Sequence, residues 1–518
     1  MTKLHRLPEF PFIQRCEKND LVEKLLEIIH IHQLNDRILK EENERLKGKI
    51  AELEHTPKKP QIRPSTIEKP RSDAKKPKNR KSKGSKKNRI SIHDEVVIKP
   101  KIIPEGASFK GYRNYLVQDI AIKSFNTCFK IERWQTKEGT YLKGTLPPEY
   151  QGSHFGPNLQ AFIIHQHYQA RVTQPRLHDQ LKAWGIEISA GQLNHILGMH
   201  TAKLEKEMAE AVDVGIKHSS FVQTDDTGAR HAGKNFVCMQ IGNQFFTRFI
   251  TCKSKSRLSF LENLRRGQNY LMNEDSIDYL KQHGTLKQVQ LAERIQGQEL
   301  EEEQFQEYLN RGGINSNPSF KEAAIIGILS KELGKAYTVL SDGAPQYNVL
   351  NHASCWVHAI RLLEKEKPIK NEKVDLVLKK LRFLYHHLKR YKVRPTELFK
   401  KRLRRYFDKI CSLKVGSNHF EAALNRFSEN KEDLLRALEN PEIPLHNNGS
   451  ENDIREYVIR RKISYGTRSD LGRRTRDLFL SLIKTCSKLG VNFWHFLINC
   501  ISFKESFPRL ANIISTTS

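Results

Sequence analysis

The sequence lacks the features that would place the chain in a membrane or in a disulfide-stabilised scaffold. It contains no apolar run long enough to span a bilayer, and its first residues, MTKLHRLPEF, include no apolar segment of the kind that signal peptides carry. None of its eight cysteines forms a Cys-x-x-Cys pair, so their spacing fits neither a disulfide framework nor a zinc ribbon. We therefore expect no membrane partner, and a reducing cytoplasm as the compartment.

Negative charge is also scarce in this chain. The 59 acidic residues face 88 lysines and arginines, which leaves a formal net charge of +29 and an isoelectric point near 9.7. Such an excess favours a polyanionic partner, with nucleic acid before an anionic membrane surface. The length of 518 residues suggests roughly three domains, and a hydrophobic fraction of 38% suffices to build their cores.

The N-terminal segment, residues 1–54, contains a seven-residue repeat that predicts a coiled coil over residues 20–54. One set of positions reads Val22, Ile29, Asp36, Asn43 and Ile50, and the other reads Leu25, His32, Leu39, Leu46 and Leu53. An asparagine at a core position, here Asn43, is a device that fixes register and dimer state. The pattern predicts a homodimer or a higher homo-oligomer, with a single amphipathic helix packed on its own domain as the alternative.

Residues 55–90 differ in composition, since they are rich in Lys, Arg, Pro and Ser and have almost no apolar side chains. Such a segment cannot bury a core, so we predict a disordered basic linker. Two interpretations of its charge stay open, namely a solvated tether and non-specific contact with phosphates.

Residues 91–215 form a predicted DNA-binding region. It begins with strand-like pieces, YLVQDIAI (115–122) and CFKIERWQT (128–136). Residues 173–200 then show helical spacing on both sides of Gly185, and Ser189 can cap the second helix. The apolar positions are Leu177, Leu181, Ile186, Ile188, Leu193, Ile196 and Leu197. This is the helix-turn-helix pattern, but any helical hairpin with a glycine turn is similar, so contact with DNA stays one of two interpretations.

The rest of the chain alternates between strands and helices. The pieces SFVQTDDT, KNFVCMQIG and QFFTRFITC, separated by GARHAGK and a Gly-Asn turn, predict an antiparallel meander. A buried strand is expected at 336–343, and helices at 256–264, 275–311, 354–438, 451–461 and 475–501. This order predicts an α/β catalytic core of the ribonuclease H-like type. The core would have a mixed sheet flanked by helices and a mostly helical insertion before the helix at 451–461.

Three carboxylates stand in separate short motifs: Asp225 in FVQTDDTG, Asp342 in YTVLSDGAPQY and Glu451 in HNNGSENDIR. Each has an ordinary explanation, because Asp often forms turns and Glu is favoured in the first turn of a helix. If the fold brings them together, they repel one another unless a cation lies between them, which predicts a magnesium site. Strand alternation directs Asp225 and Asp226 to opposite faces, so only one of the two can face a shared metal.

Around these acids the chain resembles the transposases of the insertion sequence 66 family, members of the DDE superfamily. The resemblance covers roughly residues 100–500 and rests on TDDTG, SDGAPQYNVL with CWVHAIR, HNNGSENDIREYVIRRKISYGTRSDLGRR and SLIKTCSKLGVNFWHFL. It implies a DNA transposase, a polynucleotidyl transferase that cuts the ends of a mobile element and joins them to target DNA, with Asp225, Asp342 and Glu451 as catalytic and metal-binding acids. It also implies two Mg²⁺ ions, which Mn²⁺ can replace, and double-stranded DNA as the partner.

The resemblance also orders the rest of the chain. The implied catalytic core spans 216–352 and 441–518, with a helical insertion at 353–440 between them. We expect Asp226, Cys355, Trp356, His358 and Arg361 to support the site structurally, with direct DNA contact near the cut phosphate as the second interpretation for Cys355 and His358. Residues expected to contact DNA phosphates are Lys253, Lys255, Arg257, Arg455, Arg460, Arg461, Lys462, Arg468, Arg473 and Arg474. A solvated charged surface is the alternative, and Arg455 could equally orient Glu451.

The sequence also departs from the family pattern. His446 stands where the family usually has Asp, Asn452 follows Glu451 where Arg is usual, and a basic linker replaces the family's paired-cysteine zinc element. These departures leave open a catalytically silent DNA-binding protein derived from a transposase. Two further alternatives also stay open, namely a structural coiled-coil or nucleic-acid scaffold in which the acids are incidental, and a metal-dependent structure-specific nuclease. We expect an association with the bacterial nucleoid and accessory transposition proteins as possible partners.

Overall fold

The computed structural model describes residues 92–120, 122–314, 318–368, 371–502 and 507–517, together with scattered positions between Leu25 and Leu46. The scattered positions are helical. Most of the predicted coiled coil at 20–54, and all of the predicted linker at 55–90, lie outside the described residues. Pairing of two chains through the coiled coil therefore stays a prediction.

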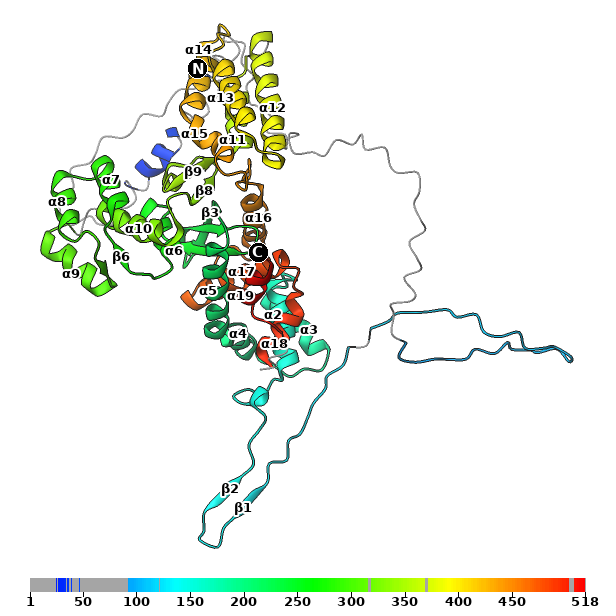
Figure 1. The fold of residues 1–518 in the computed structure, drawn as a ribbon. Coiled ribbons are helices and arrows are strands. Elements are labelled where there is room, and N and C mark those ends of the chain that lie inside the picture. Colours follow the sequence, from blue (N-terminus) through cyan, green and yellow to red (C-terminus); the bar gives the residue numbers. More distant parts are fainter. Residues whose placement is uncertain are drawn as a thin grey trace.

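A five-stranded mixed sheet lies at the centre of the molecule (Figure 1). The strand order is β5-β4-β3-β8-β9, with β3 at Phe221–His231, β4 at Lys234–Gly242, β5 at Thr247–Cys252, β8 at Thr338–Ser341 and β9 at Asn351–Ser354. The first three strands form the predicted antiparallel meander, whereas β8 and β9 run parallel to β3. The expected mixed sheet flanked by helices is confirmed, and its assignment to the ribonuclease H-like type stays a prediction.

Strand β3 is longer than the sequence indicates. We expected Asp225 and Asp226 to end the strand, with GARHAGK as the connection, and this was wrong. The pairing of β3 with β4 continues to His231 opposite Lys234, so the two aspartates lie in mid-strand. Only Ala232 and Gly233 form the turn, both with positive φ. The polar run does not break the strand because β4 supplies a hydrogen-bonding partner along its whole length.

The short strand β9 is absent from the sequence-based expectation, which placed only helix beyond residue 354. Its sequence, NHAS, does not alternate between apolar and polar residues, so a segment this short and polar does not predict a strand. Pairing with β8 makes it a strand, and His352 is buried there against Asp433.

The sheet is covered by helices that come from both ends of the described chain. Helices α5 (Thr201–Lys217), α16 (Asn448–Ser464) and α17 (Asp470–Lys488) pack near the meander strands, while α18 (Phe493–Ile501) packs on α2 (Pro157–Tyr168) and α19 (Leu510–Thr517) on α5. One apolar core joins the sheet to these helices and includes Ile164, Val222 and Phe479.

The two helices expected at 173–200 are present as α3 (Gln174–Ala183) and α4 (Ala190–Met199). Gly185 takes a positive φ of 71° between them, and the side chain of Ser189 caps α4 in a reciprocal capping box with Gln192. Their contact with DNA stays a prediction.

Two strand-like pieces upstream behave differently from the expectation. Only Arg133–Gln135 of the second piece forms a strand, β1, which pairs with β2 (Tyr141–Lys143), and a short 3-10 helix, η2, follows at Pro148–Tyr150. The described residues of YLVQDIAI form no strand. Their apolar side chains, such as Tyr115 and Ile120, are exposed, so no packing supports a strand there.

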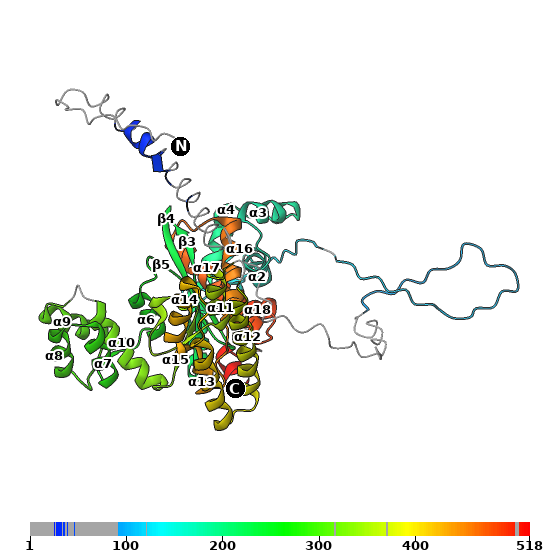
Figure 2. The same ribbon diagram turned by 90° about the horizontal axis from the view of Figure 1, so that it is seen from above.

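Two helical groups project from the sheet (Figures 1 and 2). The first is formed by the part of the chain that connects β5 to β8. This group contains α6 (Arg257–Arg265), α7 (Glu274–His283), α8 (Leu286–Arg294), α9 (Glu302–Gly312) and α10 (Pro318–Leu333). Two short strands, β6 (Tyr270–Leu271) and β7 (Glu299–Leu300), pair within it.

The second group is formed by the part of the chain that connects β9 to α16. It contains α11 (Trp356–Lys365), α12 (Glu372–Val393), α13 (Glu397–Cys411), α14 (Asn418–Glu429), α15 (Lys431–Leu434) and the 3-10 helix η4 (Arg436–Leu438). These helices enclose a core of their own, which includes Trp356, Tyr385 and Phe407. The insertion therefore has its own apolar centre and does not depend on the sheet for burial.

Among the described helices, none is long and apolar enough to cross a membrane. The described cysteines are all free thiols.

Candidate active site

Strand β3 directs its two central aspartates to different surroundings. Asp226 Oδ2 accepts hydrogen bonds from the Tyr347 hydroxyl at 2.8 Å and from Gln346 Nε2 at 3.1 Å. Lys255 Nζ lies 3.7 Å from the other oxygen of Asp226. Asp226 is therefore engaged by the segment that follows β8, and Asp225 is left to face the opposite side of the sheet.

Asp342 follows the end of β8. The parallel register pairs Gln223 of β3 with Leu340 of β8, so two residues further along each chain Asp225 and Asp342 come beside one another. Asp342 is exposed, and its Oδ1 accepts a hydrogen bond from the Ala344 amide at 3.1 Å. Gly343, with φ of +96°, turns the chain away at once and leaves the carboxylate at the strand end.

Glu451 lies in the first turn of α16, and Asn447 fixes the start of that helix. The Asn447 side-chain amide donates to the Thr224 carbonyl of β3 at 2.8 Å, and its backbone amide donates to Cys355 Sγ at 3.3 Å. Gly449 allows the close approach, because a Cβ there would lie 2.4 Å from Gln223 Oε1. The helix therefore begins against the part of β3 that carries Asp225.

The electrostatics of Asp225 show that these acids are neighbours. Burial, opposed by a hydrogen bond from the backbone amide of Asp226 and aided by the negative charges of Asp342, Asp226 and Glu451, raises the pKa of Asp225 to about 7. Three segments that are far apart in sequence thus converge at the middle of β3. A cluster of carboxylates that repel one another suits a bound divalent cation, since the cation replaces the repulsion with attraction.

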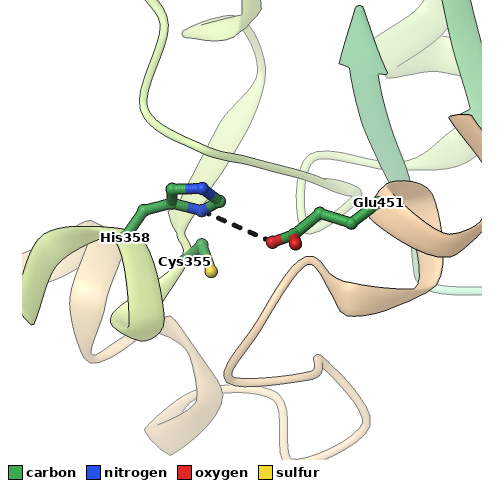
Figure 3. A group of neighbouring side chains, drawn as sticks. All are labelled: Cys355, His358 and Glu451. Atoms are coloured by element: carbon green, nitrogen blue, oxygen red, sulfur yellow. Dashed lines mark ion pairs between the residues drawn. The ribbon is translucent and has the colours of Figure 1, made fainter. Parts of the chain in front are cut away.

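A second group of side chains meets Glu451 from the insertion (Figure 3). Cys355 precedes α11 and His358 lies in its first turn, and one ligand atom from each of Cys355, His358 and Glu451 lies within 4.8 Å of the others. His358 Nδ1 is 3.8 Å from Glu451 Oε1. Trp356 is fully buried in the insertion core, where its indole donates to the Leu434 carbonyl. That these residues support the acids structurally stays a prediction.

The sequence comparisons identify the family of the chain. The sequence model of the Transposase IS66 family matches residues 152–244 and 315–475, which include all three acids. This chain belongs to that family of transposases. It is also similar to the "Uncharacterized protein y4jO" of Sinorhizobium fredii (strain NBRC 101917 / NGR234), with 41% identity over 302 residues that cover 55% of this chain and 92% of the relative.

The basic residues predicted to contact DNA in this transposase differ in exposure. Lys253, Lys255, Arg455, Lys462, Arg468 and Arg474 are exposed. Arg474 pairs with Glu205, and Arg473 donates to the Thr251 carbonyl. Arg461 is partly buried and donates to Gly228.

Two of the ten predicted DNA contacts are engaged by other parts of the fold, and one of them, Arg460, is buried. Arg460 is 3% exposed and its guanidinium bonds to the carbonyl and ring of His167, so its burial contradicts the expected DNA contact. Arg257 donates to the Tyr279 hydroxyl and to the Pro345 carbonyl, so it holds the segment after β8 in place. The exposed set is what remains available for phosphates.

Three residues near the acids were not assigned a role from the sequence: Gln346, Tyr347 and Asn447. All three lie within the motifs that carry the acids, and this proximity was the available signal. Their partners lie more than a hundred residues away in sequence, so only the fold reveals what they contact.

Proposed function

We propose that this transposase binds the ends of an insertion sequence, cuts them and joins the freed 3′-hydroxyls to target DNA, with Asp225, Asp342 and Glu451 as its catalytic acids. The observation that supports this most strongly is the approach of Asp342 and Glu451 to the buried Asp225, whose pKa is raised to about 7 by burial and, to a smaller extent, by the charges of these neighbours. A buried carboxylate beside two other acids destabilises a fold, and a site that binds cations accounts for its presence.

The proposed cofactor is a pair of Mg²⁺ ions, which Mn²⁺ can replace. Bound between the acids, they would activate water or a terminal 3′-hydroxyl and stabilise the leaving oxygen. The protein's own contribution is rigid placement. Asn447 holds the start of α16 on β3, and Tyr347 and Gln346 draw Asp226 away from Asp225, so that one aspartate of the pair serves the site.

The proposed partner is double-stranded DNA, as element ends and as target. The exposed cations Lys253, Lys255, Arg455, Lys462 and Arg468 offer phosphate contacts, and Lys255 lies beside Asp226. We further propose that the chain acts as a homodimer or higher homo-oligomer through its N-terminal heptads, in a nucleoid-associated cytoplasmic setting, with accessory transposition proteins as possible partners.

The decisive experiment is strand transfer by the purified full-length chain, with Mg²⁺ or Mn²⁺ and DNA that carries the terminal repeats of the element. The wild type is compared with Asp342→Asn and with Asp278→Asn, a matched change at an exposed position on α7. We expect joined product from the wild type and Asp278→Asn, and none from Asp342→Asn.

The other outcomes separate the alternatives. Retained binding to element ends without any product from the wild type would favour a catalytically silent DNA-binding protein or a missing accessory partner. Preferential cutting of branched DNA over terminal repeats would favour a structure-specific nuclease. Product from Asp342→Asn equal to the wild type would overturn the assignment of the acids.

A further inference from the structure

We propose that Cys355, His358 and Glu451 form a second metal site, selective for Zn²⁺ and distinct in chemistry from the all-carboxylate magnesium site. The three side chains offer one sulfur, one nitrogen and one oxygen atom, all within 4.8 Å of one another (Figure 3). Thiolate and imidazole ligands suit Zn²⁺, whereas Mg²⁺ prefers oxygen ligands throughout.

The distances suit a tetrahedral ion after small side-chain rotations. Zinc bonds of about 2.0–2.3 Å at tetrahedral angles place ligand atoms roughly 3.3–3.6 Å apart. His358 Nδ1 and Glu451 Oε1 are already 3.8 Å apart. Both side chains are partly exposed, at 31% and 29%, although the two facing atoms are themselves buried.

Burial raises the pKa of the Cys355 thiol, and backbone amides around the sulfur oppose that shift. Cys355 Sγ accepts a hydrogen bond from the Asn447 amide at 3.3 Å, and the amides of His358 and Val357 also point at it. Amide donors from two and three residues further along the chain compensate the negative charge of a thiolate. The position before the first turn of α11 adds the favourable end of the helix dipole. Metal binding would release the thiol proton to solvent.

Two polar atoms of the cluster also lack hydrogen-bond partners. His358 Nδ1 and Glu451 Oε1 are both buried atoms, and neither has a hydrogen bond within the part of the chain that the structure describes. The two atoms form a long ion pair with each other, beside Cys355 Sγ, and a cation held by all three side chains would satisfy both buried atoms. An ordinary hydrogen bond does not explain them, because 3.8 Å is too long for one.

The site would have a consequence for catalysis that rests on the proposed function. Glu451 has two carboxylate oxygens, and coordination of Oε1 by zinc would leave the other oxygen for the magnesium site. The insertion would then be tied to the third catalytic acid through a metal, and the orientation of Glu451 would depend on how the insertion is seated.

The test is titration of the metal-free full-length chain with Co²⁺, which replaces Zn²⁺ and reports thiolate ligands by a sulfur-to-metal charge-transfer band in the near ultraviolet. We expect the band to saturate at one equivalent per chain, to persist in excess Mg²⁺ and to disappear on addition of Zn²⁺. Cys355→Ser should abolish it, while Cys411→Ser, a change at a thiol in the insertion away from the cluster, should keep it. His358→Asn should weaken Co²⁺ binding about tenfold or more.

The outcomes separate this proposal from the proposed function. Asp342→Asn should lose strand transfer but keep the cobalt band, because Asp342 is not a ligand of the second site. Circular dichroism of each variant distinguishes loss of a ligand from loss of the fold, and His358→Asn provides a second variant if Cys355→Ser does not fold. Absence of the band in the wild type, or its persistence in folded Cys355→Ser, would overturn the zinc site and leave the magnesium site untouched.

Discussion

The Tyr347 hydroxyl donates a hydrogen bond of 2.8 Å to Asp226 Oδ2, which joins the segment after β8 to the middle of β3. This contact distinguishes two adjacent aspartates that look alike in the sequence. Asp226 has neutral and cationic partners, whereas Asp225 is surrounded by other acids.

The first prediction follows from this difference. Asp225→Asn should reduce strand transfer to the level of Asp342→Asn, because it removes a proposed metal ligand. Asp226→Asn should retain most activity, since an amide can still accept the hydrogen bond from Tyr347. The two variants are compared in one assay with Mg²⁺, and equal loss in both would contradict the separate roles.

The second prediction concerns Asn447, which joins the start of α16 to β3. Asn447→Ala removes the hydrogen bond to the Thr224 carbonyl and leaves that buried group without its side-chain donor, at a cost of about 1–3 kcal/mol. We expect strand transfer to fall more than thermal stability does. Asn447 positions the start of the helix that carries Glu451 four residues further along, so its loss should displace that carboxylate. Asn448→Ala, whose side chain is outside this bridge, is the matched control and should change neither.

The third prediction concerns phosphate contacts. Lys253→Ala should weaken binding to element ends and reduce the slope of log affinity against log salt by about 0.9, the value expected for one lost contact with duplex DNA. Lys281→Ala, at an exposed lysine paired with Asp278 on α7, should leave the slope unchanged. Fluorescence anisotropy over a salt series measures both, and equal slopes in all three proteins would remove Lys253 from the interface.

The fourth prediction concerns the insertion. Trp356 is fully buried among Tyr385, Phe407 and Phe427, so Trp356→Ala should destabilise the insertion by about 3–5 kcal/mol. Phe383→Ala, at an aromatic position that is 53% exposed on α12, should cost far less. Differential scanning calorimetry should show the loss in the first variant alone, and a similar midpoint for both would contradict a separate insertion core.

The fifth prediction concerns pH and His167. Burial, aided by the charge of Arg460, lowers the pKa of His167 to about 3 from its usual 6.5. The ring is neutral in the folded chain, with Nδ1 donating to the Val172 carbonyl and Nε2 accepting from Arg460. Below pH 6.5 the unfolded chain takes up a proton that the folded chain does not, so stability falls as pH falls from 6.5 towards 3.

The size of this effect can be measured. At about pH 5 the loss from His167 should be about 2 kcal/mol relative to neutral pH. His167→Gln should flatten the dependence of the melting temperature on pH between about pH 5 and neutral pH. His195→Gln, at an exposed position on α4, should leave that dependence unchanged. Parallel curves for the wild type and His167→Gln would show that this histidine does not control acid stability.

The sequence by itself determined the local elements and the identity of the chemical groups. The Gly185 turn and the Ser189 cap, the meander before α6, the buried strand before Asp342 and the long helical stretch after Trp356 all follow from short-range patterns. Periodicity and capping depend on neighbours within a few residues, so a single sequence is enough to read them. The motifs likewise sufficed to name the family, whereas the role of the three acids stays a prediction.

Only the tertiary structure decided which side chains meet. Pairing with β4 extends β3 beyond Gly228, and pairing with β8 holds the polar residues of β9 in a strand. Burial turned Arg460 from an expected DNA contact into a partner of His167. The meeting of Cys355 and His358 with Glu451 depends on the return of the chain from the insertion to the sheet. Such contacts join residues far apart in sequence, and their geometry is fixed by packing and pairing, which no local pattern records.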